Sequence, residues 1–252
     1  TPFELQNDFS VAILGLSNFF REDAAVTAQT MQIGNKPCHI YGETHAEYLL
    51  FQMTGEHELQ SMESEVAAIA QSAHRFLFAA IPVESWNDAL SPWEAPAVWG
   101  KQGFGGNAGD TLRFLTEQVI PTLKRQFPLP ENVKIILGGY SLAGLFALWA
   151  STQTNLFYGI AAASPSVWFP GWMEHEQQHP IQAQRVYLSL GDKEEHTKNA
   201  VMAVVSDNIR TLHSRLIERG ADCTLEWNSG GHFKDADLRT AKAFRWTMEE
   251  HT

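Results

Sequence analysis

Ser141 lies among small residues, in the run Gly-Gly-Tyr-Ser-Leu-Ala-Gly at positions 138–144. This run directly follows an apolar segment typical of a strand and directly precedes an apolar helical segment. A serine in such a strand–turn–helix sits at a strained tip with its hydroxyl projecting outward, as in a nucleophile elbow. The tight turn requires small residues two positions before and after the serine, and these are Gly139 and Ala143. We therefore predict that Ser141 is a nucleophile rather than a simple helix cap, with helix N–H groups directed at developing negative charge.

A serine nucleophile needs a base, and His232 has a suitable position. The run Gly-Gly-His-Phe at 230–233 follows the last expected strand and precedes the last expected helix. A hydrolase triad with the chain order serine, acid, histidine places its histidine on this loop. The chain has ten histidines, and we expect His232 to be the one that takes the proton of the serine.

The acid that orients this histidine should follow the strand between the two segments. The apolar run at 185–190 ends in Gly-Asp-Lys-Glu-Glu, which offers Asp192, Glu194 and Glu195. We favour Glu194, because Asp192 lies within reach of loop amides and adjacent side chains on an extended loop diverge, which directs Glu195 elsewhere. The acid would fix the histidine tautomer and stabilise the imidazolium without taking the proton. The alternatives are one of the other two carboxylates, or a loop whose acids are only solvated.

A second motif indicates a different chemistry. His175, Glu176 and His179 match the His-Glu-x-x-His pattern of zinc peptidases. Such a site needs both histidines on one face of a core helix and a third ligand beyond them. This run is polar on all sides and Pro180 follows it at once. We therefore expect a solvated loop or a short surface helix here, without a metal.

An alternation of strands and helices must position these motifs. Apolar, β-rich runs predict strands at 48–53, 75–81, 133–137, 159–163, 185–190 and 223–227. Helical spacing predicts helices at 58–73, 110–126 (kinked or restarted at Pro121), 141–151, 198–219 and 235–251. Strands that are apolar almost without alternation are typical of a parallel sheet buried on both faces. The predicted fold class is therefore α/β, with a mostly parallel central sheet and helices on both faces.

Composition and charge limit the remaining possibilities. The 252 residues are 44% hydrophobic, which is ample for a core and excludes a disordered chain. The formal net charge of −11 disfavours binding to nucleic acid or to an anionic membrane. No apolar run approaches the roughly 20 residues that span a bilayer. Cys38 and Cys223 indicate free thiols in a reducing compartment, so we expect a cytoplasmic protein.

The length allows one α/β domain over residues 1–252. Met31 is either an internal residue of this domain or the start of the functional unit. In the second case residues 1–30 are an N-terminal extension to the core.

The order of the motifs resembles the putative esterase family of α/β-hydrolases, which includes esterase D-like, feruloyl and siderophore esterases. The elbow, Ala-Ala-Ala-Ser-Pro-Ser-Val-Trp at 161–168 and the runs around Glu194 and His232 carry the resemblance, over roughly residues 37–250. The chain departs from the family in Ala143 for glycine, in a glutamate where aspartate is commoner, and in lacking a His-Gly pair after the strand at 48–53. The resemblance implies an oxyanion hole formed by the backbone N–H groups of Leu142 and of a residue near Glu56.

We therefore expect a serine carboxylic-ester hydrolase that forms an acyl-enzyme with a small-molecule ester and requires no metal or organic cofactor. Trp168 and Trp93 are the expected pocket residues, because ligands bind near the carboxyl ends of parallel strands. The same triad supports acyl transfer to an acceptor other than water. The alternatives from other classes are a zinc metallopeptidase and a non-catalytic binding module, which would not need the complete Ser/Glu/His set. The natural ester and the oligomeric state stay open.

Overall fold

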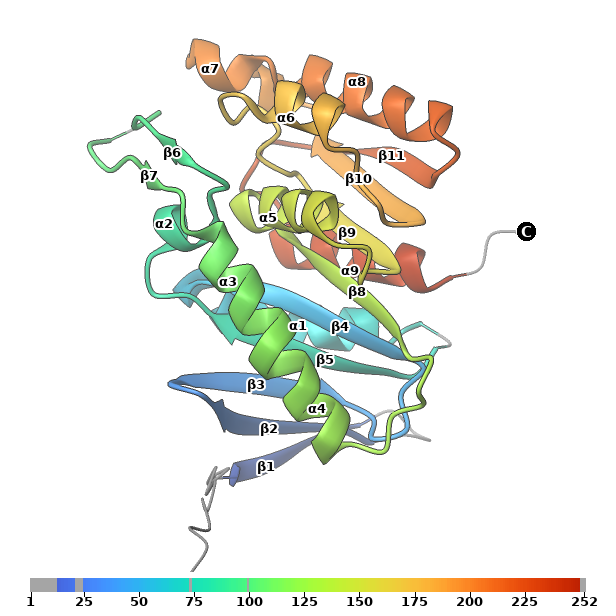
Figure 1. Ribbon diagram of the computed structural model, residues 1–252. Helices are drawn as coiled ribbons and strands as arrows, with labels where there is room; N and C mark the ends of the chain where they lie inside the picture. Colours follow the sequence, from blue (N-terminus) through green and yellow to red (C-terminus); the bar gives the residue numbers. More distant parts are fainter. Residues whose placement is uncertain (1–12, 21–24, 73, 99, 250–252) are drawn as a thin grey trace, which may run out of the picture.

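One mixed sheet forms the centre of the molecule. The computed structural model describes residues 13–20, 25–72, 74–98 and 100–249. The strands of the large sheet are β1 (Ile13–Phe20), β2 (Ala25–Ile33), β3 (Lys36–Gly42), β4 (Tyr48–Thr54), β5 (Phe76–Pro82), β8 (Lys134–Tyr140), β9 (Gly159–Ala163), β10 (Arg185–Gly191) and β11 (Asp222–Asn228). Among the described residues their order is β1-β2-β3-β5-β4-β8-β9-β10-β11 (Figure 1). The pairs from β5 to β11 are parallel, whereas β1 with β2, β2 with β3 and β3 with β5 are antiparallel.

Helices cover both faces of this sheet. They are α1 (Glu56–Ile69), α2 (Trp86–Leu90), α3 (Ala108–Phe114), α4 (Ile120–Gln126), α5 (Leu142–Gln153), α6 (Trp172–Gln178), α7 (Ala200–Ala203), α8 (Val205–Glu218) and α9 (Ala236–Met248). Helices α1 and α9 lie on one face, and α4, α5, α6 and α8 lie on the other (Figure 1). Their buried side chains accordingly belong to two separate apolar clusters. A short hairpin of β6 (Glu94–Ala95) and β7 (Phe104–Gly105) projects beside α2. The α/β class, with a mostly parallel sheet between two helical layers, is therefore confirmed.

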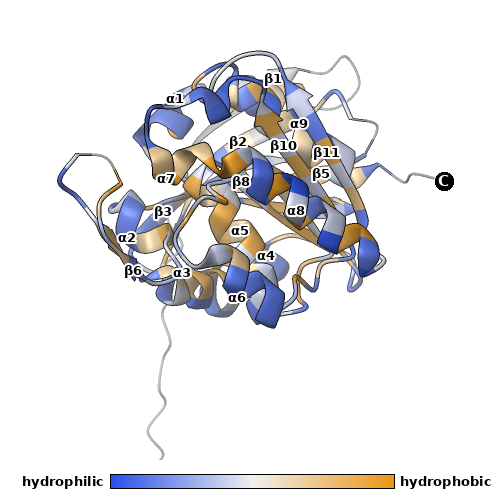
Figure 2. Ribbon diagram, turned by 90° about the horizontal axis from the view of Figure 1, so that it is seen from above, coloured by the Kyte–Doolittle hydropathy of each residue, from blue (hydrophilic) through white to orange (hydrophobic). Residues whose placement is uncertain are grey.

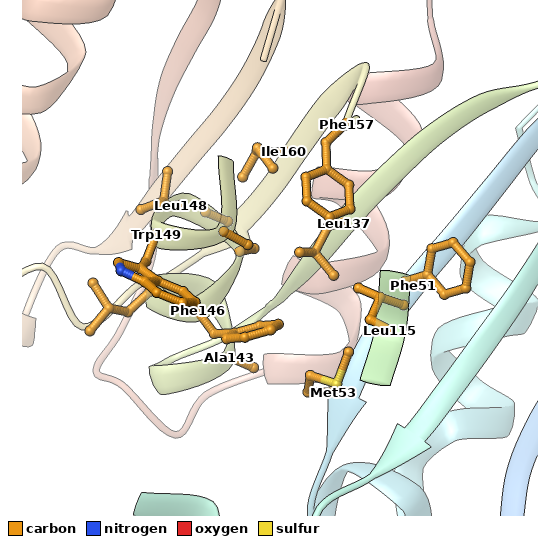
Figure 3. Packing of buried hydrophobic residues seen from close by; sticks show 14 of the residues in the cluster. Phe51, Met53, Leu115, Leu137, Ala143, Phe146, Leu148, Trp149, Phe157 and Ile160 are labelled. Carbon is orange, nitrogen blue, oxygen red and sulfur yellow. The ribbon is translucent and has the colours of Figure 1, made fainter. Parts of the chain in front are cut away.

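The strand beside the elbow strand and the helix after the elbow are buried almost completely. Every residue of β4 is buried, with Leu50 in the cluster under α1 and α9 and Phe51 in the cluster under α5. In α5 the residues from 142 to 152 are all buried, and Figure 3 shows Phe146 packed among apolar side chains of neighbouring elements. Hydrophobic residues accordingly concentrate in the sheet and α5, while the outer faces of α1 and α8 are more hydrophilic (Figure 2). The elbow joins β8 to α5, and both are almost completely buried, so the packing around them fixes its position.

Two expected helices are interrupted. The helix expected at 110–126 consists of α3, a π-helical stretch (Leu115–Val119) and α4, with Pro121 in the first turn of α4. Proline lacks the backbone N–H, and a first turn does not need it. The helix expected at 198–219 is divided into α7 and α8. Within the described residues, no helix has the length and apolar character that crossing a bilayer requires.

The antiparallel strands before β4 lie outside the expected set. In β3 the buried residues Cys38, Ile40 and Gly42 alternate with more exposed ones, so the strand has no continuous apolar run. Met31 lies within β2, is 3% exposed and joins the core. We infer that Met31 is an internal residue of the domain and that the residues of β2 belong to its sheet.

We predict that deleting residues 1–30 will lower the melting temperature and cause aggregation. The deletion removes β1 and leaves only three of the seven β2–β3 residue pairs, those from Met31 to Ile33. It also creates an unpaired edge at β3, which promotes association between chains. Thermal unfolding and size-exclusion chromatography measure both effects.

In the full chain, Met31→Asp should be destabilising, while Gln32→Asp on the exposed side of β2 should be nearly neutral. A soluble chain beginning at Met31 with an unchanged melting temperature would contradict this assignment.

Candidate active site

Ser141 occupies the tip of the turn between β8 and α5. Its backbone has φ 58° and ψ −120°, a conformation that costs a non-glycine residue about 1–3 kcal/mol. Hydrogen bonds hold it there: Ser141 N–H donates to the Ala163 carbonyl at 3.1 Å, and its own carbonyl accepts from Ser166 N–H at 3.0 Å and Leu145 N–H at 3.1 Å. The neighbouring strand β9 and its following loop therefore maintain the strained elbow.

The small residues around the serine have a steric cause. A Cβ atom on Gly139 would lie 2.6 Å from the Cβ of Ala143, which is closer than such atoms approach. A Cβ on Gly144 would lie 3.0 Å from the Gly139 carbonyl oxygen. Ala143 is tolerated in place of the usual glycine because the residue opposite it has no side chain.

The structure brings Ser141, His232 and Glu194 into one chain of hydrogen bonds. The distance from Ser141 Oγ to His232 Nε2 is 2.9 Å, and from His232 Nδ1 to Glu194 Oε2 it is 2.7 Å. Since a carboxylate oxygen accepts, Nδ1 carries the proton and Nε2 can accept from the serine hydroxyl. Ser141 follows β8, Glu194 follows β10 and His232 follows β11, so all three lie beyond the carboxyl ends of parallel strands. Parallel alignment of the strands thus gathers residues that are far apart in the sequence.

The Glu194 carboxylate is buried and accepts hydrogen bonds from several segments. Its side chain is 5% exposed. Its Oε1 atom accepts from Ser164 Oγ at 2.7 Å, from the Gly191 N–H at 2.7 Å and from Arg239 Nη1 at 3.4 Å. Ser164 itself has a positive φ of 41°, which turns its hydroxyl toward the carboxylate at the end of β9. These contacts fix the carboxylate with its second oxygen facing the imidazole.

Arg239 and Tyr140 brace the loop that carries the histidine. Arg239 is 4% exposed and donates from Nη1 to the Tyr140 hydroxyl at 3.1 Å and from Nη2 to the Ser229 carbonyl at 3.1 Å. The Tyr140 hydroxyl donates to the His232 carbonyl at 2.6 Å. Neither residue could be identified from the sequence, because their contacts span 92 and 99 positions. The one feature of the sequence that pointed to a role for Tyr140 is its position directly before the elbow serine.

The two other candidate acids are engaged elsewhere, as the sequence predicted. Asp192 Oδ1 accepts from the Gly230 N–H at 2.8 Å and so ties the Glu194 loop to the His232 loop. Glu195 lies 4.0 Å from Arg210 of α8. Within the described part of the chain, the carboxylate that bonds to His232 is that of Glu194.

A cavity of about 660 Å³ opens beside Ser141 and His232. Trp168, expected at the pocket, lines it together with Trp86 of α2, which the sequence analysis did not single out. The expectation for Trp93 is wrong. Trp93 donates from its indole to the Pro170 carbonyl at 2.9 Å and packs against Phe169, which draws the ring toward the loop before α6.

The expected oxyanion positions lie at neighbouring strand ends. Leu142 is the first residue of α5 and Glu56 the first residue of α1. Gln52 of β4 pairs with Gly138 of β8, so the residues that follow these two strands lie at the same level. His57, one position beyond Glu56, lines the cavity.

The His-Glu-x-x-His run lies on α6 and its end, but its side chains are used in packing. The run lies on a short helix with Gln177, Gln178 and His179 exposed, as one of the two expectations had it. Glu176 departs from this expectation, because it is fully buried and pairs with Arg215 and Arg219. Two guanidinium groups offset the burial of its charge. The His175 and His179 rings stack on each other at 4.5 Å, and His175 Nε2 lies 3.0 Å from Thr152 Oγ1. In the described part of the chain no three His, Cys, Asp or Glu side chains form a group suited to a metal ion.

The two cysteines are free, and burial raises the pKa of each thiol to about 12. Thiolates at Cys38 and Cys223 are therefore scarce at neutral pH, which disfavours both as nucleophiles.

The chain belongs to the family described as "Putative esterase", whose model matches residues 63–234. It is an ester hydrolase with the α/β-hydrolase fold. The uncharacterized protein YbbA of Bacillus subtilis (strain 168) is 25% identical over 172 residues, which cover 66% of this chain and 67% of YbbA.

Solved structures similar to this chain include esterases and hydrolases. The siderophore hydrolase EstB from Aspergillus nidulans has a TM-score of 0.67 at 16% identity, over 97% of this chain and 98% of EstB. The BES protein from Bacillus cereus has a TM-score of 0.64 at 18% identity, over 99% and 100%. The enterobactin esterase FES from Shigella flexneri, with enterobactin, has a TM-score of 0.65 at 15% identity, over 95% of this chain and 59% of FES. At sequence identities of 15–18%, the similarity to these structures shows that the chain shares their fold.

We predict that Arg239→Met will lower the free energy of unfolding by about 3–5 kcal/mol, because it leaves the buried Glu194 carboxylate without its cation. Lys242→Met on the same helix is the control. Lys242 is 53% exposed and pairs with Glu226 at the surface, so its replacement should change stability by less than about 1 kcal/mol. Urea unfolding measures both changes. An unchanged urea midpoint for Arg239→Met would contradict the claim that Arg239 stabilises the buried Glu194 carboxylate.

Proposed function

We propose that this ester hydrolase works through an acyl-enzyme formed on Ser141, with His232 as general base and Glu194 as the acid that orients it. The observation that carries the proposal is the continuous chain of hydrogen bonds from Ser141 Oγ through the imidazole to the Glu194 carboxylate. The buried setting of that carboxylate supports the role, since it keeps the imidazole in one tautomer and stabilises its protonated form.

The first half of the reaction forms the acyl-enzyme. Ser141 Oγ attacks the ester carbonyl carbon while His232 Nε2 takes the hydroxyl proton. Negative charge develops on the carbonyl oxygen, next to the start of α5. The backbone N–H of Leu142 and one near Glu56 would donate to that oxygen. The imidazolium then gives its proton to the leaving alkoxide, and the alcohol departs.

Water completes the cycle in the second half. His232 removes a proton from a water molecule, which attacks the acyl carbonyl of Ser141. The tetrahedral intermediate collapses, the imidazolium returns the proton to Ser141 Oγ, and the carboxylic acid leaves. A small-molecule ester fits a cavity of about 660 Å³, which is within the range of ligand pockets. Trp168 and Trp86 would pack against an apolar or aromatic part of that ester.

The proposal is tested by hydrolysis of a panel of nitrophenyl and natural esters by the wild type and by Ser141→Ala. We expect the wild type to cleave at least the activated esters and Ser141→Ala to lose nearly all of this activity, because its hydrolysis would fall to what binding and oxyanion contacts alone provide. Ester hydrolysis that persists in Ser141→Ala would exclude this serine as the nucleophile.

The role of the acid is tested by Glu194→Gln. A glutamine can favour the wrong tautomer of His232, so kcat should fall by about three to four orders of magnitude with a much smaller change in KM. Asp192→Asn and Glu195→Gln are matched controls on the same loop, and each should cost less than about tenfold, or about 1.4 kcal/mol of barrier. Circular dichroism confirms that each variant is folded. Loss of activity in a control variant with an active Glu194→Gln would reassign the acid.

A further inference from the structure

The cavity beside Ser141 continues between α1 and α9, and carboxyl groups line this part of it. Glu58 and Glu65 come from α1, and Asp237 comes from the first turn of α9. Gln52 of β4 lies with them. We call these four residues the acidic end of the cavity. Among the described residues that line the cavity there is no lysine or arginine.

Two side chains of the acidic end carry buried oxygens that lack a donor. Glu65 is 2% exposed and Gln52 is 1% exposed. Gln52 Nε2 donates to Glu65 Oε2 at 3.3 Å, but within the described residues Glu65 Oε1 and Gln52 Oε1 have no hydrogen-bond partner. Leaving such a group unsatisfied is unfavourable, so a donor that enters from the cavity would be stabilised here.

The carboxyl groups of the acidic end act on one another. Burial raises the pKa of Glu65 well above its usual range, and the charges of Asp237 and Glu58 raise it further, against the effect of the Gln52 hydrogen bond. Glu58 accepts from the Gly55 N–H at 3.0 Å and Asp237 from Ser64 Oγ at 2.8 Å, so these partners are neutral donors. A positive charge placed between the carboxyl groups would be attracted by the charges of Glu58 and Asp237 and would favour the ionised form of Glu65.

We propose that the acidic end binds a protonated amine carried by one arm of the ester substrate. This inference rests on the proposed function, because it places the ester carbonyl at Ser141. An ammonium group has three donors and no acceptor, which matches a set of carboxyl and amide oxygens. Gln52 pairs with Gly138, three residues before Ser141, so the strand rise places the two sites about 10 Å apart. The substrate class is an ester with an amine at the end of an arm of that length.

Matched pairs of esters that differ in one terminal group test the proposal. On the acyl side, phenyl 6-aminohexanoate is compared with phenyl heptanoate, in which a methyl group replaces the ammonium. On the alcohol side, 5-aminopentyl benzoate is compared with hexyl benzoate. We expect kcat/KM to favour the amine by at least tenfold in one of the two pairs, as expected for charge-assisted hydrogen bonds in a partly buried site. The adipate monophenyl ester, which ends in a carboxylate, should be a poorer substrate than the heptanoate.

Variants of the acidic end show whether these residues cause the preference. Glu65→Gln and Asp237→Asn keep the shape of each side chain but leave no group that can be negatively charged beside a bound ammonium, so each should lower the ratio of kcat/KM between amine and methyl esters by at least threefold. Glu63→Gln is the matched control, because Glu63 lies on the exposed side of α1 and does not line the cavity. It should leave the ratio unchanged. Asp237→Asn also provides a second test if Glu65→Gln does not fold.

The failure of this inference can be told apart from the failure of the proposed function. If Ser141→Ala abolishes cleavage of the methyl esters and neither amine is preferred, the proposed mechanism stands and the amine site is wrong. Water alone would then satisfy the buried oxygens. A preference for the amine that persists in both Glu65→Gln and Asp237→Asn would also overturn the assignment. If cleavage of the methyl esters survives in Ser141→Ala, the proposed function itself fails.

Discussion

The buried negative charge of Glu194 is the constraint on which the rest of this site depends. A carboxylate with 5% exposure is stable only if donors replace the water it has lost. Those donors come from different parts of the chain: Ser164 after β9, Gly191 at the end of β10, Arg239 in α9 and His232 after β11. Satisfying one charge therefore requires three strand ends and a helix to hold a single arrangement.

The same arrangement accounts for the strained backbone nearby. Ser141 and Ser164 both have positive φ, and both are anchored by hydrogen bonds to the neighbouring strand: Ser141 N–H to the Ala163 carbonyl and Ser164 N–H to the Ser189 carbonyl. Strain of this kind persists only where the surroundings determine the conformation, and here the parallel sheet does so. The elbow directs one hydroxyl toward His232, while Ser164 directs the other toward Glu194. A rigid site of this kind requires no rearrangement to bring its three side chains together.

Much of this arrangement could be predicted from local sequence. The strand runs before residues 141 and 191 are continuous and apolar, so the ends of the buried parallel strands could be located, and with them Ser141, Glu194 and His232. The contacts of Arg239 and Tyr140 could not, because they join residues that only the folded sheet brings together. Strand β3 alternates buried and more exposed residues and therefore lacks a continuous apolar run. Trp86 begins α2 and Trp93 follows soon after that helix, and only tertiary packing decides which of the two rings reaches the cavity.

The central claim, that Ser141 is a nucleophile activated by His232, is tested most directly by covalent labelling with a fluorophosphonate. Intact-mass analysis followed by peptide mapping locates the adduct. The account predicts one adduct per chain on Ser141, and none on folded Ser141→Ala protein. An adduct on another residue, one that survives Ser141→Ala, or no adduct on wild-type protein that hydrolyses esters would contradict it.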